Sequence, residues 1–121
     1  MAWDMSSERP IYIQLVERIT RQIASGVYSP GDRFPSVREL ALEAAVNPNT
    51  MQRAMAALEA DGLLVTSRTA GRTVTDDTAL IETVKKNLAM SEYGNFYRSM
   101  RELGYSDDEI VRFVKETKPQ D

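Results

Sequence analysis

Neither cysteine nor histidine occurs among the 121 residues of this chain. Their absence excludes disulfides, thiol chemistry and the usual zinc sites. There is also no run of about 18 apolar residues, which a membrane-spanning helix would need. The N-terminal residues lack the basic and apolar regions of a signal peptide. We therefore expect a soluble cytoplasmic protein that uses no metal and no other cofactor.

The charge balance is slightly acidic, with a net charge of −3 at pH 7. This is a mild argument against nucleic-acid binding, because DNA-binding domains are usually basic. Residues 1–75, however, hold eight arginines and eight acidic residues, whereas residues 76–121 hold seven basic and ten acidic residues. The deficit thus lies in the second part, and clustered arginines in the first part could still form a positive surface. We expect weaker non-specific DNA binding than a strongly basic protein would show.

The most informative stretch is residues 30–75, where two capped helices are joined by a tight turn. Ser36 followed by Glu39 is a capping box that opens the first helix. Asn47 is a suitable N-cap for the second helix, and Gly62 can take the left-handed conformation that ends it. Two helices in this order are typical of a helix-turn-helix, although an ordinary helical hairpin in an unrelated core remains an alternative.

A short hairpin after the second helix makes that alternative less favourable. Residues 63–66 and 72–75 have β-type composition, and the arginine-rich residues 68–72 are expected to form the tip between them. Residues 33–34 are predicted to be a very short strand that pairs with this hairpin. An amphipathic helix is predicted from Pro10 to about Ser25, and the first nine residues are expected to be loose.

At this point the sequence resembles a GntR-family transcriptional regulator over roughly residues 10 to 75. The segments that carry the resemblance are Pro10–Leu15, Gly26–Ala41 and Leu58–Leu64. The remainder resembles the YtrA-type subgroup, whose members have only a short helical C-terminal segment that dimerises. The fold expected is therefore mainly α with a small β-hairpin: a winged helix-turn-helix in residues 1–75, then a helical dimerisation segment in residues 76–121.

The start of the second helix of the motif is expected to lie in the major groove. Asn49 and Gln52 could form bidentate bonds with adenine, and Arg53 could do so with guanine. The Thr50 methyl could touch a thymine methyl, although Thr50 and Arg53 could equally hold phosphates. For each of these residues the alternative is a polar side chain that simply faces solvent.

Arg38 is the strongest single candidate for a DNA contact. The resemblance implies that the arginine of Ser-Val-Arg-Glu-Leu contacts a guanine or the adjacent backbone, and Arg38 matches it. The alternative is a surface salt bridge with Glu39 or Glu43, which would contribute little to stability. Ser36 is expected to bond a phosphate as well as capping the helix.

The hairpin tip is expected to hold the DNA backbone rather than to read bases. Arg68, Thr69 and Arg72 could straddle a phosphate backbone, and Gly71 lets the main chain approach the minor groove. Because the tip is short and has one glycine, phosphate contact is favoured over insertion into the groove. Arg33 lies beside these residues in the motif and is added to the predicted DNA-binding set.

Residues 76–121 are predicted to form two or three helices with an apolar stripe, and Gly94 is a possible kink or break. Ser106 with Glu109 is a second capping box. Such a short segment cannot bury its stripe alone, so it folds back on the winged domain or pairs with a second copy; we favour pairing. The predicted dimerisation residues are Leu80, Val84, Leu88, Phe96, Tyr97 and Met100. Aromatic residues in this segment could instead line a ligand pocket.

These features predict a dimeric, sequence-specific transcriptional regulator, a repressor that binds a palindromic operator in double-stranded DNA. The competing hypothesis is a winged helix that binds another protein and has no specific affinity for DNA. An enzyme is not expected, because no pair of acidic residues stands out as a catalytic constellation. The sequence does not reveal an effector.

Overall fold

A computed structural model provides the fold and describes residues 2–120. These residues form two compact units that divide between Lys85 and Lys86, and the two units are called unit 1 and unit 2 below. None of the helices described in residues 2–120 has the length and apolar character needed to cross a membrane.

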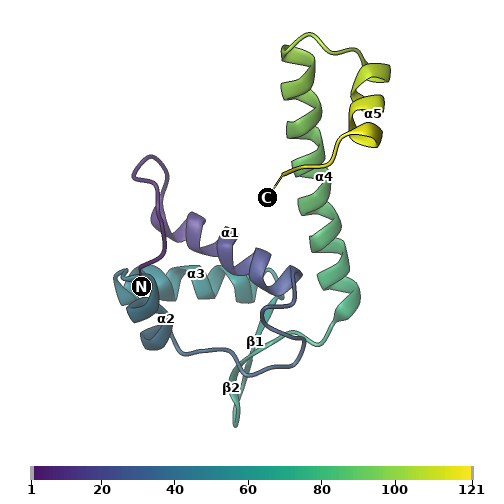
Figure 1. Ribbon diagram of the computed structural model, residues 1–121. Coiled ribbons are helices and arrows are strands. Elements are labelled where there is room, and N and C mark those ends of the chain that lie inside the picture. Colours follow the sequence, from purple (N-terminus) through teal and green to yellow (C-terminus); the bar gives the residue numbers. More distant parts are fainter. Residues whose placement is uncertain (1, 121) are drawn as a thin grey trace. The chain divides into compact units, whose positions relative to one another are not determined.

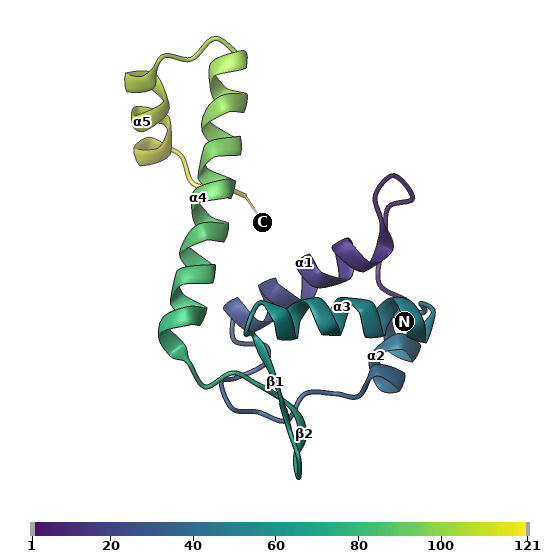
Figure 2. The ribbon, with the colours of Figure 1, turned by 180° about the vertical axis from the view of Figure 1, so that it is seen from behind.

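Three helices make the body of unit 1: α1 (Ile11–Ala24), α2 (Val37–Ala44) and α3 (Pro48–Ala60). Helices α1 and α3 lie side by side in both ribbon views, and α2 packs against α3 (Figures 1 and 2). The apolar residues of α1 repeat every four positions and therefore share one face, which meets the apolar face of α3. The buried side chains of these two faces are Leu15, Ile19, Ile23, Met51, Ala54, Met55 and Leu58.

The helix starts are fixed by the caps predicted from the sequence. The Ser36 hydroxyl accepts a hydrogen bond from the Glu39 backbone N–H, and the Glu39 carboxylate accepts one from the Ser36 backbone N–H, both at 3.1 Å. At α3, the Asn47 side-chain oxygen accepts a hydrogen bond of 2.7 Å from the Asn49 N–H. The tight turn between α2 and α3 passes through Ala45, which has a φ of 59°. A left-handed non-glycine residue is uncommon and marks a tightly constrained turn.

Strands β1 (Leu64–Ser67) and β2 (Gly71–Val74) form an antiparallel hairpin, which is called the wing. The wing extends beyond the helices of unit 1 in both views (Figures 1 and 2). Each strand lies one residue closer to the tip than predicted, because the turn is tighter. The Ser67 hydroxyl accepts hydrogen bonds from two turn N–H groups, and Gly71 has a φ of 71°. The expected short strand is present as a single bridge between Arg33 and Thr73.

The N-terminal segment differs from the expectation that it is loose. Trp3 is 8% exposed and belongs to the core of unit 1. Its backbone N–H donates to the Ala44 carbonyl at 3.2 Å, and its indole N–H donates to the Glu43 carboxylate at 3.1 Å. The Arg18 guanidinium lies 4.5 Å from the centre of its ring. Trp3, together with the partly buried Met5, therefore holds this segment against the core of unit 1.

Helix α4 (Thr78–Glu102) is continuous through Gly94, so the chain does not divide into two helices there. Its first turns belong to unit 1. Ile81 is buried in the core of that unit, and Leu80 and Val84 pack against the same core. The Asp77 carboxylate accepts a hydrogen bond from the Leu80 N–H at 3.0 Å, as expected for an acidic residue at a helix start.

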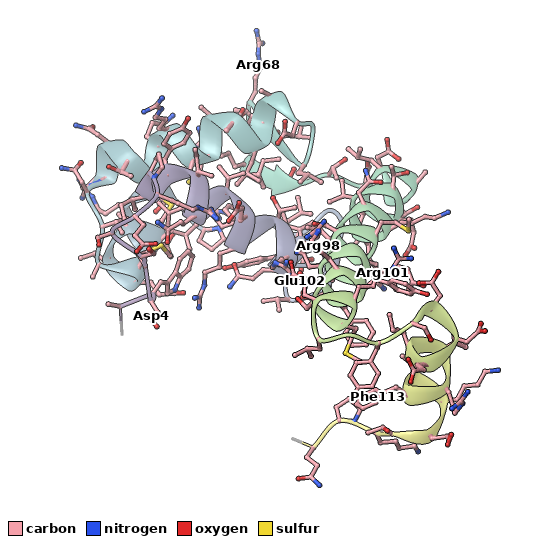
Figure 3. All side chains as sticks on the ribbon, turned by 90° about the horizontal axis from the view of Figure 1, so that it is seen from above. Asp4, Arg68, Arg98, Arg101, Glu102 and Phe113 are labelled. Atoms are coloured by element: carbon pink, nitrogen blue, oxygen red, sulfur yellow. The ribbon has the colours of Figure 1, made fainter. Side chains whose placement is uncertain are left out.

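Unit 2 contains the rest of α4 and helix α5 (Asp107–Glu116), joined by a turn at Gly104. The predicted capping box of Ser106 and Glu109 opens α5. Met100 and Ile110 are the buried apolar residues of this unit. Phe113 extends from α5 toward α4 (Figure 3), and its ring lies 6.1 Å from that of Tyr105.

Candidate nucleic-acid interface

A groove of about 340 Å³ lies between the start of α2 and the wing, and it is called the wing groove. Four of the predicted DNA-binding residues line it: Arg33, Ser36, Gly71 and Arg72. They come from two separate parts of the sequence, residues 33–36 and 71–72. The wing is held there by backbone bonds, including one of 2.8 Å from the Phe34 N–H to the Arg72 carbonyl. The fold thus joins a helix N-terminus with two arginines at one concave surface.

This surface suits an anion. The unpaired N–H groups at a helix start carry partial positive charge, and Arg33 adds a full charge beside them. The Glu39 carboxylate is also near, but it is held in the capping box. Hydrogen bonds from the backbone and hydroxyl of Ser36 lower its pKa below the ordinary value of 4.5. Its negative charge therefore stabilises the N-terminus of α2.

Arg38 is exposed on the first turn of α2. The two carboxylates considered as salt-bridge partners are engaged elsewhere: Glu39 with Ser36, and Glu43 with the Trp3 indole. Within the residues that the structure describes, Arg38 forms no ion pair. The guanidinium is therefore available to an external partner.

The start of α3 presents the residues expected to read bases. Asn49, Gln52 and Arg53 are exposed and Thr50 is half-buried. The Arg53 guanidinium lies 3.8 Å from the centre of the Tyr12 ring on α1. This cation–π contact restricts the orientation of Arg53. The contact was not predictable from the sequence, because the partners lie 41 positions apart and no local pattern joins them.

The two arginines of the wing lie in different environments. Arg68 is exposed at the tip, where its side chain extends clear of the neighbouring elements (Figure 3), and Thr69 is exposed beside it. Arg72 is mostly buried, and its Nε donates to the Glu59 carboxylate at 2.7 Å. Arg68 is thus free to reach a distant phosphate, whereas Arg72 is tied to the end of α3.

The predicted dimerisation residues also divide into groups. Leu80 and Val84 pack against the core of unit 1, and Met100 is buried in unit 2, so each already has neighbours within the chain. Leu88 and Tyr97 are half-buried, and Phe96 is exposed. A further set of large apolar side chains is exposed in unit 2 and was not in the predicted set: Met90, Tyr93, Leu103, Tyr105, Val111, Phe113 and Val114.

Within residues 2–120 there is no cluster of three or more histidine, cysteine or acidic side chains that could hold a metal ion. The polar groups of unit 1 instead form helix caps, ion pairs and exposed cationic side chains. Exposed cationic side chains of this kind can bind an anionic polymer.

Comparison with known proteins gives a consistent set of relatives. A sequence profile described as "Bacterial regulatory proteins, gntR family" matches residues 11–74. The chain is 33% identical over 109 residues to the uncharacterized HTH-type transcriptional regulator YhcF of Bacillus subtilis, covering 90% of each protein. It is 38% identical over 81 residues to the HTH-type transcriptional repressor YtrA of the same organism, covering 65% of this chain and 62% of YtrA.

Solved structures agree. A GntR family transcriptional regulator from Listeria monocytogenes matches with a TM-score of 0.84 and 38% identity, over 94% of this chain and 100% of that one. The DNA-binding domain of AraR in complex with operator ORE1 matches with a TM-score of 0.52 and 28% identity, over 62% of this chain and 94% of that one. The expected likeness to YtrA and the expected winged-helix fold are confirmed.

Proposed function

The chain belongs to the gntR family of bacterial regulatory proteins, and we propose that it is a dimeric repressor that binds a palindromic operator. Its family and relatives are DNA-binding transcriptional regulators and not enzymes. The repressor role draws support from the similarity to YtrA, which is named a repressor. As a repressor it would act in the cytoplasm, beside the chromosome.

The observation that carries the DNA-binding proposal is the wing groove, together with the exposed start of α3. We assign base reading to Asn49 and Gln52, whose amides match the edge of adenine, and to Arg38, which matches guanine. We assign phosphate contacts to residues of the groove, the wing tip and α3: Arg33, Ser36, Thr50, Arg53, Arg68, Thr69 and Arg72. Gly71 allows the backbone to approach the DNA closely.

The dimer proposal rests on the exposed apolar surface of unit 2. Eight of the eleven large apolar side chains exposed within residues 2–120 lie in that unit. An exposed apolar surface of this kind is typical of an interaction site. A two-fold dimer presents two identical recognition helices, and a palindromic operator has the matching symmetry.

Selection of duplexes from random-sequence DNA, followed by sedimentation of the free protein and of its complex with a selected duplex, tests this function. We expect an enriched palindrome, a dimer in solution and one dimer on each duplex. Selection without any enriched sequence would refute specific DNA binding and favour a protein-binding module. An enriched half-site bound by a monomer would refute the dimer alone.

A further inference from the structure

Glu59, near the end of α3, joins that helix to both strands of the wing. One oxygen of its carboxylate accepts a hydrogen bond of 2.7 Å from the Arg72 Nε on β2. The other accepts a hydrogen bond from the Thr66 hydroxyl on β1. Thr66 and Arg72 are directly opposite each other in the hairpin register. One side chain of α3 therefore holds a cross-strand pair of the wing.

This ion pair is more shielded from water than the other two described with it. The side chains of Glu59 and Arg72 are 29% and 21% exposed, whereas those of Arg9–Glu17 and Arg101–Asp107 are at least half exposed. Hydrogen bonds from Thr66 and Arg72 lower the pKa of Glu59 below its ordinary value of 4.5. The carboxylate is therefore charged at neutral pH, and the contact persists there.

We propose that Glu59 is a positioning residue for DNA binding, which holds the wing against α3 and directs Arg72 toward a phosphate in the wing groove. The proposal rests on the DNA-binding function proposed above. Arg72 lines the groove while its Nε is bound to Glu59. A guanidinium has five N–H donors, so the terminal nitrogens can donate to a phosphate. A side chain that is already ordered loses less conformational entropy on binding.

The sign of the effect separates this role from simple electrostatics. A carboxylate near the DNA repels the phosphates, so electrostatics alone predicts that its removal tightens binding. Positioning predicts the opposite, because Arg72 and the wing lose their fixed arrangement. Asp61 provides a matched control, since it is an exposed acid two residues further along and it caps the same helix end only through its backbone.

The experiment measures affinity of the full chain for the operator selected with the unaltered protein. We expect Glu59→Ala to weaken binding by about fivefold per half-site, the equivalent of one partly exposed ion pair. Asp61→Asn should leave affinity unchanged or raise it. Glu59→Gln keeps a hydrogen-bond acceptor, so its affinity should lie between that of Glu59→Ala and that of the unaltered chain. This variant provides the test if Glu59→Ala folds poorly. Glu59 variants that bind as tightly as Asp61→Asn would overturn the proposal.

A double-mutant cycle then asks whether Glu59 acts through Arg72. In a chain that already carries Arg72→Ala, we expect Glu59→Ala to cause little further loss, because the residue it orients is gone. Equal losses in both backgrounds would overturn the proposed route through Arg72, since a purely structural role does not depend on that side chain. If the unaltered chain bound no duplex, the proposed function would fail as well. Normal binding that is insensitive to Glu59 refutes only this inference.

Discussion

The first turns of α4 should be part of the DNA-binding unit, so a chain that ends at Thr75 should be less stable than one that ends at Lys85. Ile81 is only 8% exposed, and Leu80 and Val84 are partly buried against the same core. Complete burial of such side chains contributes about 1.5–3 kcal/mol each, so these three contribute roughly 4 kcal/mol. Allowing for a compact unfolded chain reduces this to about 3 kcal/mol.

That difference is large beside the total stability of a small domain, which is about 5–15 kcal/mol. Urea unfolding of the two shortened chains would measure it, with the single buried tryptophan, Trp3, as the fluorescent reporter. With a dependence on urea of about 1.5 kcal/mol per molar, the midpoints should differ by roughly 2 M.

Two substitutions in the full chain provide the control. Ile81→Ala should destabilise it by about 2 kcal/mol or more, because it leaves a cavity in the core. Glu82→Ala, at the exposed neighbouring position, should change stability by no more than about 0.5 kcal/mol. Equal urea midpoints for the two shortened chains would refute the reasoning and would place the end of the DNA-binding unit at Thr75, as the sequence predicted.

Three further predictions concern the DNA-binding surface and the caps. Arg38→Ala should weaken operator binding by roughly 1–3 kcal/mol per half-site with an unchanged melting temperature, and an unchanged affinity would leave Arg38 an ordinary surface cation. Gln52→Ala should relax base preference at one position of each half-site. Arg68→Ala should instead weaken binding to all sequences and reduce the slope of log affinity against log salt concentration by about one unit. Operator selection and salt titration of both variants would test this, and the opposite pattern would show that the two roles are reversed. The pKa values of Glu39 and Glu109 are lowered by hydrogen bonds from the serine of each capping box. Because the folded-state values lie below the unfolded ones, the stabilisation is present above about pH 4.5 and is lost as the pH falls through the folded values. The unfolding free energy of the double variant Glu39→Gln/Glu109→Gln should therefore depend less on pH below about 4.5 than that of the unaltered chain, and an identical pH dependence would contradict this.

The helix boundaries could be predicted because they depend on neighbouring residues. Ser36 with Glu39, and Ser106 with Glu109, satisfy free backbone groups within one turn, and both capping boxes form as expected. The strand ends were displaced by one residue because the turn depends on how the Ser67 hydroxyl folds back on the chain. Amino-acid composition does not show whether such a hydrogen bond forms, so it does not fix the residue at which each strand ends.

Contacts between distant parts of the sequence were not predictable in the same way. The docking of Trp3 depends on Arg18 and Glu43, which become neighbours only after α1 and α2 have packed. A repeat at helical spacing likewise shows that Leu80 and Val84 share an apolar face, but does not say what covers that face. In this chain the core of unit 1 covers Leu80 and Val84, which the sequence pattern placed with the other apolar residues at a dimer interface.

Internal contacts of both kinds, local and distant, explain how a unit with no net positive charge can present a cationic surface. Acidic side chains beside the exposed arginines are held by internal partners: Glu39 by Ser36, Glu43 by Trp3, and Glu59 by Thr66 and Arg72. Arg33, Arg38 and Arg68 remain exposed on or near the surface assigned to DNA. A formal charge count treats all these groups alike, whereas a phosphate approaching the surface meets the exposed arginines first. The net charge of the unit therefore affects the strength of non-specific attraction to DNA. Which acidic side chains have internal partners instead affects which part of the surface attracts a phosphate.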